Sequence, residues 1–91
     1  MREKTVETAL VRQCKRIGAL CIKLVPDYMA GLPDRMILFN GKCVFVELKA
    51  PGKTPRPIQR HVHELIRAQG FGVAVVDSVA MVEDFVRNTL Y

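Results

Sequence analysis

The chain has no tryptophan, and aromatic residues make up only 7% of its 91 residues. Proteins that hold single-stranded nucleic acid usually stack its bases on aromatic rings, so a stacking platform is not indicated. The sequence also lacks an apolar run long enough to cross a bilayer. Its opening residues, MREKTVETAL, are amphipathic and do not form a charged segment followed by an apolar one. We therefore expect an intracellular protein without a membrane partner.

Paired cysteines are also missing. The chain has three, Cys14, Cys21 and Cys43, and each lies within an apolar pattern. A disulfide framework or a structural zinc site needs an even or closely spaced set of cysteines. The sequence therefore predicts reduced cysteines that serve as small core residues.

Acidic residues are outnumbered, nine against fourteen lysines and arginines, which leaves a formal net charge of +5. A basic surplus suits a polyanionic partner such as nucleic acid, although many small basic proteins bind no such partner. The length allows one domain, residues 1–91, with a core of limited size.

Hydrophobic periodicity predicts seven elements in the order helix, three strands, helix, strand, helix. Their expected ranges are 3–17, 20–25, 34–40, 42–49, 58–69, 72–76 and 78–90. This order predicts an α/β fold with a mixed central sheet flanked by helices. The wholly apolar strand 72–76 is expected at the centre of the sheet. Helix 58–69 is expected to bury a face made of Ile58, Val62, Leu65 and Ile66.

The strongest local signal is Asn40-Gly41, which lies between two apolar strands and predicts a tight type I′ hairpin. If these are the two turn residues, counting outward pairs Phe39 with Lys42 and eventually Asp34 with Glu47. Side chains of directly opposed residues share a face and have Cβ atoms roughly 4.5–5.5 Å apart. The sequence therefore predicts two carboxylates side by side. A three-residue turn would instead place Asp34 opposite Leu48 and separate the two acids.

Two opposed carboxylates repel one another, and partly buried ones cannot both ionise without a compensating charge. A divalent cation such as Mg²⁺ would supply it, since Mg²⁺ is commonly held by one or two carboxylates and substrate phosphates. Lys49 lies two residues beyond Glu47, on the same face, where it could contact a phosphate or the attacking water. The alternative is a strand that carries charged residues only because its end emerges into solvent.

Glu7 falls on the apolar arc of the first helix, between Val11 and Cys14. An acid there is either tolerated at the boundary of the buried face or directed at the same metal. The sequence leaves both interpretations open.

The motif Gly31-Leu32-Pro33-Asp34, followed by Glu47-Leu48-Lys49 and then Gln59, resembles the pattern G-x-P-D, E-x-K, Q of the VRR-NUC nucleases. These are a branch of the PD-(D/E)xK superfamily, and the resemblance extends from Glu7 to about Ser78. It implies a restriction-endonuclease-like fold and Mg²⁺- or Mn²⁺-dependent cleavage of DNA. Short stand-alone members, often from phages and bacteria, resemble enzymes that resolve Holliday junctions as homodimers. The implied location is the cytoplasm of a bacterium or of a phage-infected host.

By position, the resemblance makes Asp34 and Glu47 metal ligands, with the main-chain carbonyl of Leu48 as a third. It makes Lys49 the catalytic lysine and places Gln59 on the helix beside the site. Glu7 matches an acid that the superfamily often carries on its first helix, as a catalytic residue and a further ligand.

Basic side chains near this motif are candidate contacts for DNA phosphates. The set comprises Lys23, Arg35, Lys53, Arg56, Arg60 and, one turn after Gln59, His63. The alternative is that the loop cations are simply solvated and that Lys23 is an edge-strand charge. Three functions remain open: a junction-resolving endonuclease, a nuclease for flaps or plain duplex, and a non-catalytic DNA-binding module.

Overall fold

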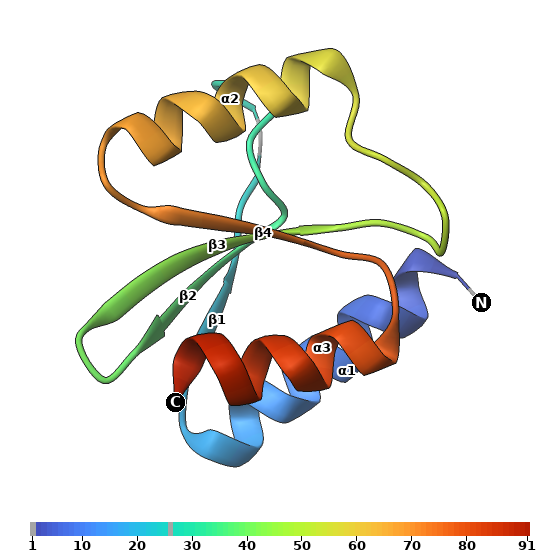
Figure 1. Cartoon of the computed structure of the whole chain (residues 1–91), viewed down its shortest axis with the longest axis vertical. Coiled ribbons are helices and arrows are strands. Elements are labelled where there is room, and N and C mark those ends of the chain that lie inside the picture. Colours follow the sequence, from blue (N-terminus) through green and yellow to red (C-terminus); the bar gives the residue numbers. More distant parts are fainter. Residues whose placement is uncertain (1, 26) are drawn as a thin grey trace.

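The computed structural model describes residues 2–25 and 27–91. Its elements are α1 (Glu3–Ile17), β1 (Leu20–Lys23), β2 (Arg35–Phe39), β3 (Lys42–Leu48), α2 (Pro57–Ala68), β4 (Gly72–Val76), α3 (Val79–Phe85) and η1 (Val86–Leu90), a π-helical continuation of α3. The strands form one sheet in the order β1-β2-β3-β4. Helices α1 and α3 lie against one face and α2 against the other (Figure 1). The predicted α/β fold with a mixed, helix-flanked sheet is confirmed.

The hairpin between β2 and β3 has the predicted register. Phe39 pairs with Lys42, and Met36 pairs with Phe45. Asn40 and Gly41 have φ angles of 49° and 80°, as a type I′ turn requires. The last recorded pair is Arg35 with Val46, so one further step places Asp34 opposite Glu47.

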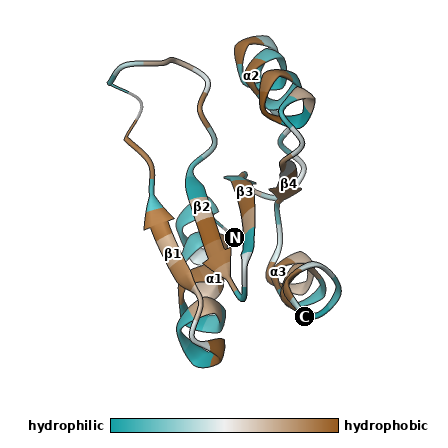
Figure 2. Ribbon diagram, turned by 90° about the vertical axis from the view of Figure 1, so that its left-hand side faces the viewer, coloured by the Kyte–Doolittle hydropathy of each residue, from teal (hydrophilic) through white to brown (hydrophobic). Residues whose placement is uncertain are grey.

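The last strand differs from expectation. β4 pairs in parallel with β3 and lies at an edge of the sheet instead of its centre. Its apolar composition has a different cause, because α2 and α3 cover its two faces (Figures 1 and 2). A wholly apolar strand therefore indicates that both of its faces are covered. An edge strand can meet this condition as well as a central one.

The main core lies between the sheet and the helices α1 and α3. Helix α1 buries Val6, Leu10 and Cys14, and it ends at Gly18, whose φ is 82°. Ser78 caps α3 by accepting a hydrogen bond from the backbone N of Met81 at 3.1 Å. The apolar side chains of the closing segment cover the sheet, and its buried members are Val82, Phe85, Val86 and Leu90. All three cysteines are free.

The buried face of helix α2 agrees with the predicted one at Val62 but differs at Ile58 and Leu65. Its buried side chains are Gln59, Val62 and His63, whereas Ile58 and Leu65 are 45% and 44% exposed. The helix is thus turned so that two polar side chains face the sheet. None of the described helices has both the length and the apolar character needed to span a membrane.

Candidate metal centre

The candidate site is built around Glu47, near the C-terminal end of β3. This side chain points to the α2 face of the sheet, because Val46 and Leu48 on either side of it point into the α1–α3 core. Glu47 is only 1% exposed. A buried carboxylate is costly unless hydrogen bonds or an opposite charge compensate it, so its neighbours are informative.

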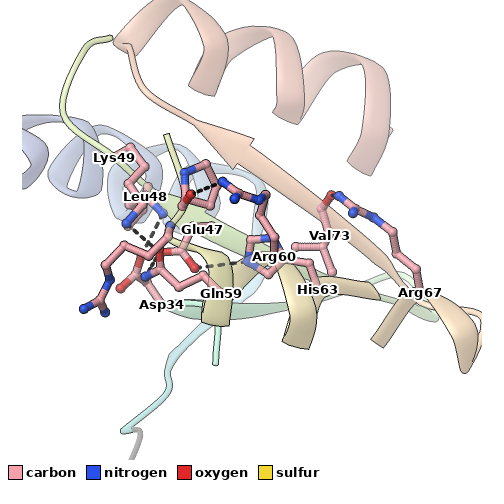
Figure 3. A network of polar contacts seen from close by, with 11 residues as sticks. Asp34, Glu47, Leu48, Lys49, Gln59, Arg60, His63, Arg67 and Val73 are labelled. Carbon is pink, nitrogen blue, oxygen red and sulfur yellow. Dashed lines mark hydrogen bonds and ion pairs between the residues drawn. The ribbon is translucent and has the colours of Figure 1, made fainter. Parts of the chain in front are cut away.

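Both oxygens of Glu47 have partners from α2. The Nε2 of Gln59 donates a hydrogen bond to Oε2 at 3.2 Å, and the Nε2 of His63 lies 3.2 Å from Oε1 (Figure 3). Gln59 and His63 are four residues apart and therefore project from the same side of the helix. Gln59 also accepts a hydrogen bond from the backbone N of Arg56 at 2.8 Å, which ties the site to the start of α2.

Asp34 approaches Glu47 from the loop before β2. Its Oδ2 accepts a hydrogen bond from the backbone N of Leu48 at 2.7 Å, while its own carbonyl accepts one from Leu24 at 2.9 Å. Asp34 is thereby fixed at the peptide unit that joins Glu47 to Leu48. The opposed acids predicted from the hairpin register do lie together (Figure 3).

The electrostatics of this pair are unfavourable for two negative charges. Burial, and next the charge of Asp34, raise the pKa of Glu47 from 4.5 to about 8, although the Lys49 ammonium acts in the opposite direction. The Nζ of Lys49 lies 3.6 Å from Oε2 of Glu47. Burial, followed by the charges of Arg67 and Lys49, lowers the pKa of His63. His63 is therefore neutral at physiological pH and can donate from Nε2 to an ionised Glu47.

The donor set fits a hard divalent cation. Asp34 and Glu47 present carboxylate oxygens next to the main chain of Leu48, and a positive charge would offset both causes of the raised pKa of Glu47, its burial and the charge of Asp34. Within residues 2–25 and 27–91, no three His, Cys, Asp or Glu side chains are grouped to hold a metal. Such a site would therefore need main-chain, water or phosphate oxygens as well, as Mg²⁺ sites usually do.

Glu7 is engaged elsewhere. Its Oε2 accepts hydrogen bonds from Nη2 and Nε of Arg35, at 3.0 and 3.3 Å. Arg35 also donates to the carbonyl of Cys21 at 3.2 Å. These contacts join α1 to the first residue of β2, directly after Asp34, and they occupy a guanidinium that the sequence suggested for DNA.

The other basic residues selected from the sequence divide into two groups. Lys23, Lys53, Arg56 and Arg60 are exposed, as contact with DNA would require. Arg60 also donates to the carbonyl of Pro55 at 2.7 Å. His63 lacks the exposure expected of such a contact, since it is 2% exposed and packs against Glu47. The spacing of Gln59 and His63 was the available signal for this placement, but the apolar pattern of the helix favoured a different face.

Comparisons with known proteins agree with this geometry. No family model matches the chain. A protein of Acyrthosiphon pisum secondary endosymbiont phage 1, named "Putative nuclease p44", is 43% identical over 79 residues, which are 86% of this chain and 85% of the phage protein. A solved structure described as "VRR_NUC domain" has a TM-score of 0.87 and 30% sequence identity, and the match covers 96% of each chain.

Proposed function

Because the chain belongs to the VRR-NUC family, we propose that it is a divalent-metal-dependent, structure-selective DNA endonuclease that resolves four-way junctions as a homodimer. One observation carries the proposal. The buried polar or charged side chains of the described residues are Glu47, Gln59 and His63, and the last two both contact Glu47 beside Asp34. Burying such a cluster costs free energy of folding, and a small domain is only marginally stable. A buried polar cluster with a perturbed pKa is therefore better explained by catalysis than by a contribution to folding.

The proposed metal ligands are Asp34, Glu47 and the main-chain carbonyl of Leu48, with Mg²⁺ or Mn²⁺ as the cofactor. When bound, the ion would lower the pKa of a coordinated water and offset charge on the phosphate. The protein holds the two carboxylates in place through the Leu48 backbone N and the two polar side chains of α2. This support comes from regular elements, which favours a rigid site.

Lys49 and Gln59 complete the catalytic set. Lys49 is 3.6 Å from Glu47 and its side chain is 14% exposed, so its ammonium lies where the buried site meets solvent. There it can hold a scissile phosphate or orient the attacking water. Gln59 acts on the carboxylate of Glu47, which it fixes with a hydrogen bond.

Glu7 is proposed as a further ligand, and its ion pair with Arg35 makes this role testable. Both hydrogen bonds from Arg35 go to Oε2, so Glu7 could coordinate the ion through Oε1 while the ion pair holds its carboxylate in place. Glu7→Gln should then weaken metal binding. A loss of stability with unchanged metal affinity would assign Glu7 a purely structural role.

DNA would be bound through its backbone by the exposed cations near the site. We assign phosphate contacts to Lys23, Lys53, Arg56 and Arg60, and to Arg35 once DNA competes with Glu7 for its guanidinium. Such contacts make affinity salt-dependent without reading sequence. His63 contributes indirectly, through Glu47.

A homodimer would supply the two symmetric cuts that a four-way junction needs. Large apolar side chains are exposed on α2 and β1, including Ile58, Leu65, Leu20 and Ile22. These side chains are candidate contacts with a second protomer, because homodimer interfaces are richer in apolar area than the rest of a protein surface. The proposed location is the cytoplasm of a bacterium or of a phage-infected host.

Cleavage assays with matched substrates test the proposal. A four-way junction, a flap, a nicked duplex and a plain duplex of related sequence would be incubated with the protein in Mg²⁺ and in EDTA. We expect the protein to cut the four-way junction in preference to the other substrates, in Mg²⁺ but not in EDTA. Preference for the flap or plain duplex would replace junction resolution with a simpler nuclease activity, and binding without any cutting would favour a non-catalytic module.

A further inference from the structure

A second basic surface lies on α1, outside the candidate metal centre. Lys4, Thr8 and Arg12 follow one another at intervals of four residues and therefore lie in a row along the helix, with Lys15 beside its far end. We call these four residues the α1 stripe. All four are exposed. Helix α1 packs on the core through Val6, Leu10 and Cys14, so the fold does not require cations on this outer side.

The stripe forms a ridge between two surface hollows. Both hollows are lined by Lys4, Thr8 and Arg12. The first, of about 290 Å³, lies toward Val79 at the start of α3. The second, of about 410 Å³, lies toward Arg35 and also includes Lys15. A rigid positive ridge is thus accessible from both sides.

The charge of the stripe is not neutralised within the molecule. The ion pairs recorded among residues 2–25 and 27–91 include none made by Lys4, Arg12 or Lys15. The acid nearest to it on the helix, Glu7, is paired with Arg35 instead. Three cations on one helix face therefore remain available to an anionic partner.

The position of the stripe relates it to the metal centre. The pair Glu7–Arg35 fixes the first half of α1 to β2, next to Asp34, and the start of α1 lies on the same side of the molecule as the loop that follows β3 (Figure 1). From Lys4 to Lys15 the helix rises about 16 Å. This length corresponds to roughly five base-pair steps of duplex DNA. The stripe thus leads away from the centre over a distance that suits a flanking duplex.

We propose that the α1 stripe binds backbone phosphates of the DNA duplex that flanks the cleavage site. This inference rests on the proposed function and adds a contact surface to it. Lys4, Arg12 and Lys15 supply charge-assisted hydrogen bonds to phosphate oxygens, and the Thr8 hydroxyl can donate a neutral one. The contacts fix the orientation of the duplex and carry no information on its sequence.

The test compares an Arg12→Gln/Lys15→Gln double variant with an Arg87→Gln control. Arg87 is an exposed arginine whose ion pair is with Asp84, and its removal tests for a general effect of lost charge. Binding to a duplex is measured in EDTA, which prevents metal-dependent cutting, over a series of salt concentrations. Because each lost phosphate contact changes the slope of log affinity against log salt by about 0.9, the double variant should lose about 2. The control should keep the wild-type slope.

The outcomes separate this proposal from the proposed activity. The proposed role of the α1 stripe is overturned if the double variant keeps the wild-type slope, if the control loses as much as the double variant, or if the wild type does not bind the duplex. A wild type that binds with the expected slope but does not cut in Mg²⁺ contradicts the nuclease function and still supports the stripe. Circular dichroism and thermal unfolding of each variant test whether the helix is intact. We expect no change, because the substituted side chains are exposed.

Discussion

Among single residues, Glu47 combines burial with an unusual number of polar contacts. It is 1% exposed, both carboxylate oxygens have partners on α2, and Lys49 lies beside it. Asp34 adds a like charge from the loop before β2, which contributes, after burial, to the raised pKa of Glu47. Repulsion of this kind reduces the stability of the free protein and favours binding of a cation.

Replacement of Asp34 by asparagine tests whether the charge of Asp34 lowers the stability of the metal-free protein and supports the binding of Mg²⁺. The amide keeps a side-chain oxygen for the Leu48 backbone N, but it removes the charge that opposes Glu47. Without metal, Asp34→Asn should unfold at a higher temperature than the wild type; a gain of about 1 kcal/mol corresponds to about 4–8 °C for a domain of this size. Mg²⁺ should stabilise the wild type and not the variant. Differential scanning fluorimetry with and without Mg²⁺ measures both effects, and an Mg²⁺-induced shift that survives the substitution would argue against this ligand assignment.

His63 is expected to act on the metal through Glu47. His63→Phe keeps a ring in the buried position and removes the Nε2 that contacts Oε1. Residues that orient a metal ligand typically contribute about 10–100-fold to metal affinity. The Mg²⁺ concentration for half-maximal cleavage should rise by about that factor, with a smaller change in the rate at saturating Mg²⁺.

His61→Phe is the matched control, because His61 lies on the same helix and is exposed. It should leave the Mg²⁺ requirement unchanged. Equal effects of the two substitutions would mean that the contact with Glu47 has no special role.

Sequence reasoning accounts for part of this site. The distance from the Asn40-Gly41 turn is enough to place Asp34 against Glu47, because strand pairing follows directly from a two-residue loop. The contact of His63 was not predicted, since apolar residues on α2 suggested a different buried face. Polar side chains can be buried in place of apolar ones when they hydrogen-bond to each other. The partner of His63 is Glu47, and only the three-dimensional structure shows that the two lie together.

At the scale of secondary-structure elements, Gly31 connects the loop before β2 with α2. Its φ is +88°, and a Cβ at this position would lie 2.7 Å from the backbone O of Ile58 and 2.9 Å from a methyl carbon of Val62. The close approach seats α2, which carries Gln59 and His63, beside the loop that carries Asp34. The glycine of the G-x-P-D motif therefore has a packing role.

Comparison of two glycine substitutions tests this role. Gly41→Ala meets only the cost of a left-handed backbone, about 1–2 kcal/mol, because no atom beyond its chain neighbours lies within 4 Å of the added carbon. Gly31→Ala meets the same cost and also displaces α2. In urea denaturation Gly31→Ala should lose clearly more stability than Gly41→Ala. It should also lose cleavage activity under conditions where both variants are folded, and equal losses would contradict the proposed contact.

The elements themselves were largely predictable. The ranges of α1 and β4 agree with the sequence pattern, as does the hairpin turn. The place of β4 at the edge was not, because periodicity shows which faces are covered and says nothing of the order of strands. The π-helical end of the closing segment likewise has no signature in the apolar pattern.

For the whole molecule, the layers separate two tasks. The α1–α3 side of the sheet holds the main apolar core, while the α2 side holds the polar cluster around Glu47 (Figures 2 and 3). Exposed basic side chains lie in the loop after β3, at Lys53 and Arg56, and along the outer side of α1 in the α1 stripe. Both basic regions adjoin the end of the sheet where Asp34 and Glu47 meet, which is the arrangement expected of a protein that holds DNA across its site.

The proposed homodimer gives a direct expectation for the molecular mass. Light scattering coupled to gel filtration should give twice the chain mass of 10.3 kDa at the concentrations used for junction cleavage. The apolar side chains exposed on α2 and β1 are the physical reason. A mass of one chain under conditions where the junction is fully resolved would contradict the dimeric mechanism.

The most direct test of the central claim is the single-turnover cleavage of a labelled four-way junction by the wild type and by Glu47→Gln in Mg²⁺. Glutamine preserves the size of the side chain and an oxygen for the α2 contacts, but it removes the charge that would hold the metal. We predict efficient cleavage by the wild type and, for the folded variant, a rate no higher than that of the wild type in EDTA. Wild-type rates in Glu47→Gln would contradict the assignment of this carboxylate to a catalytic metal site.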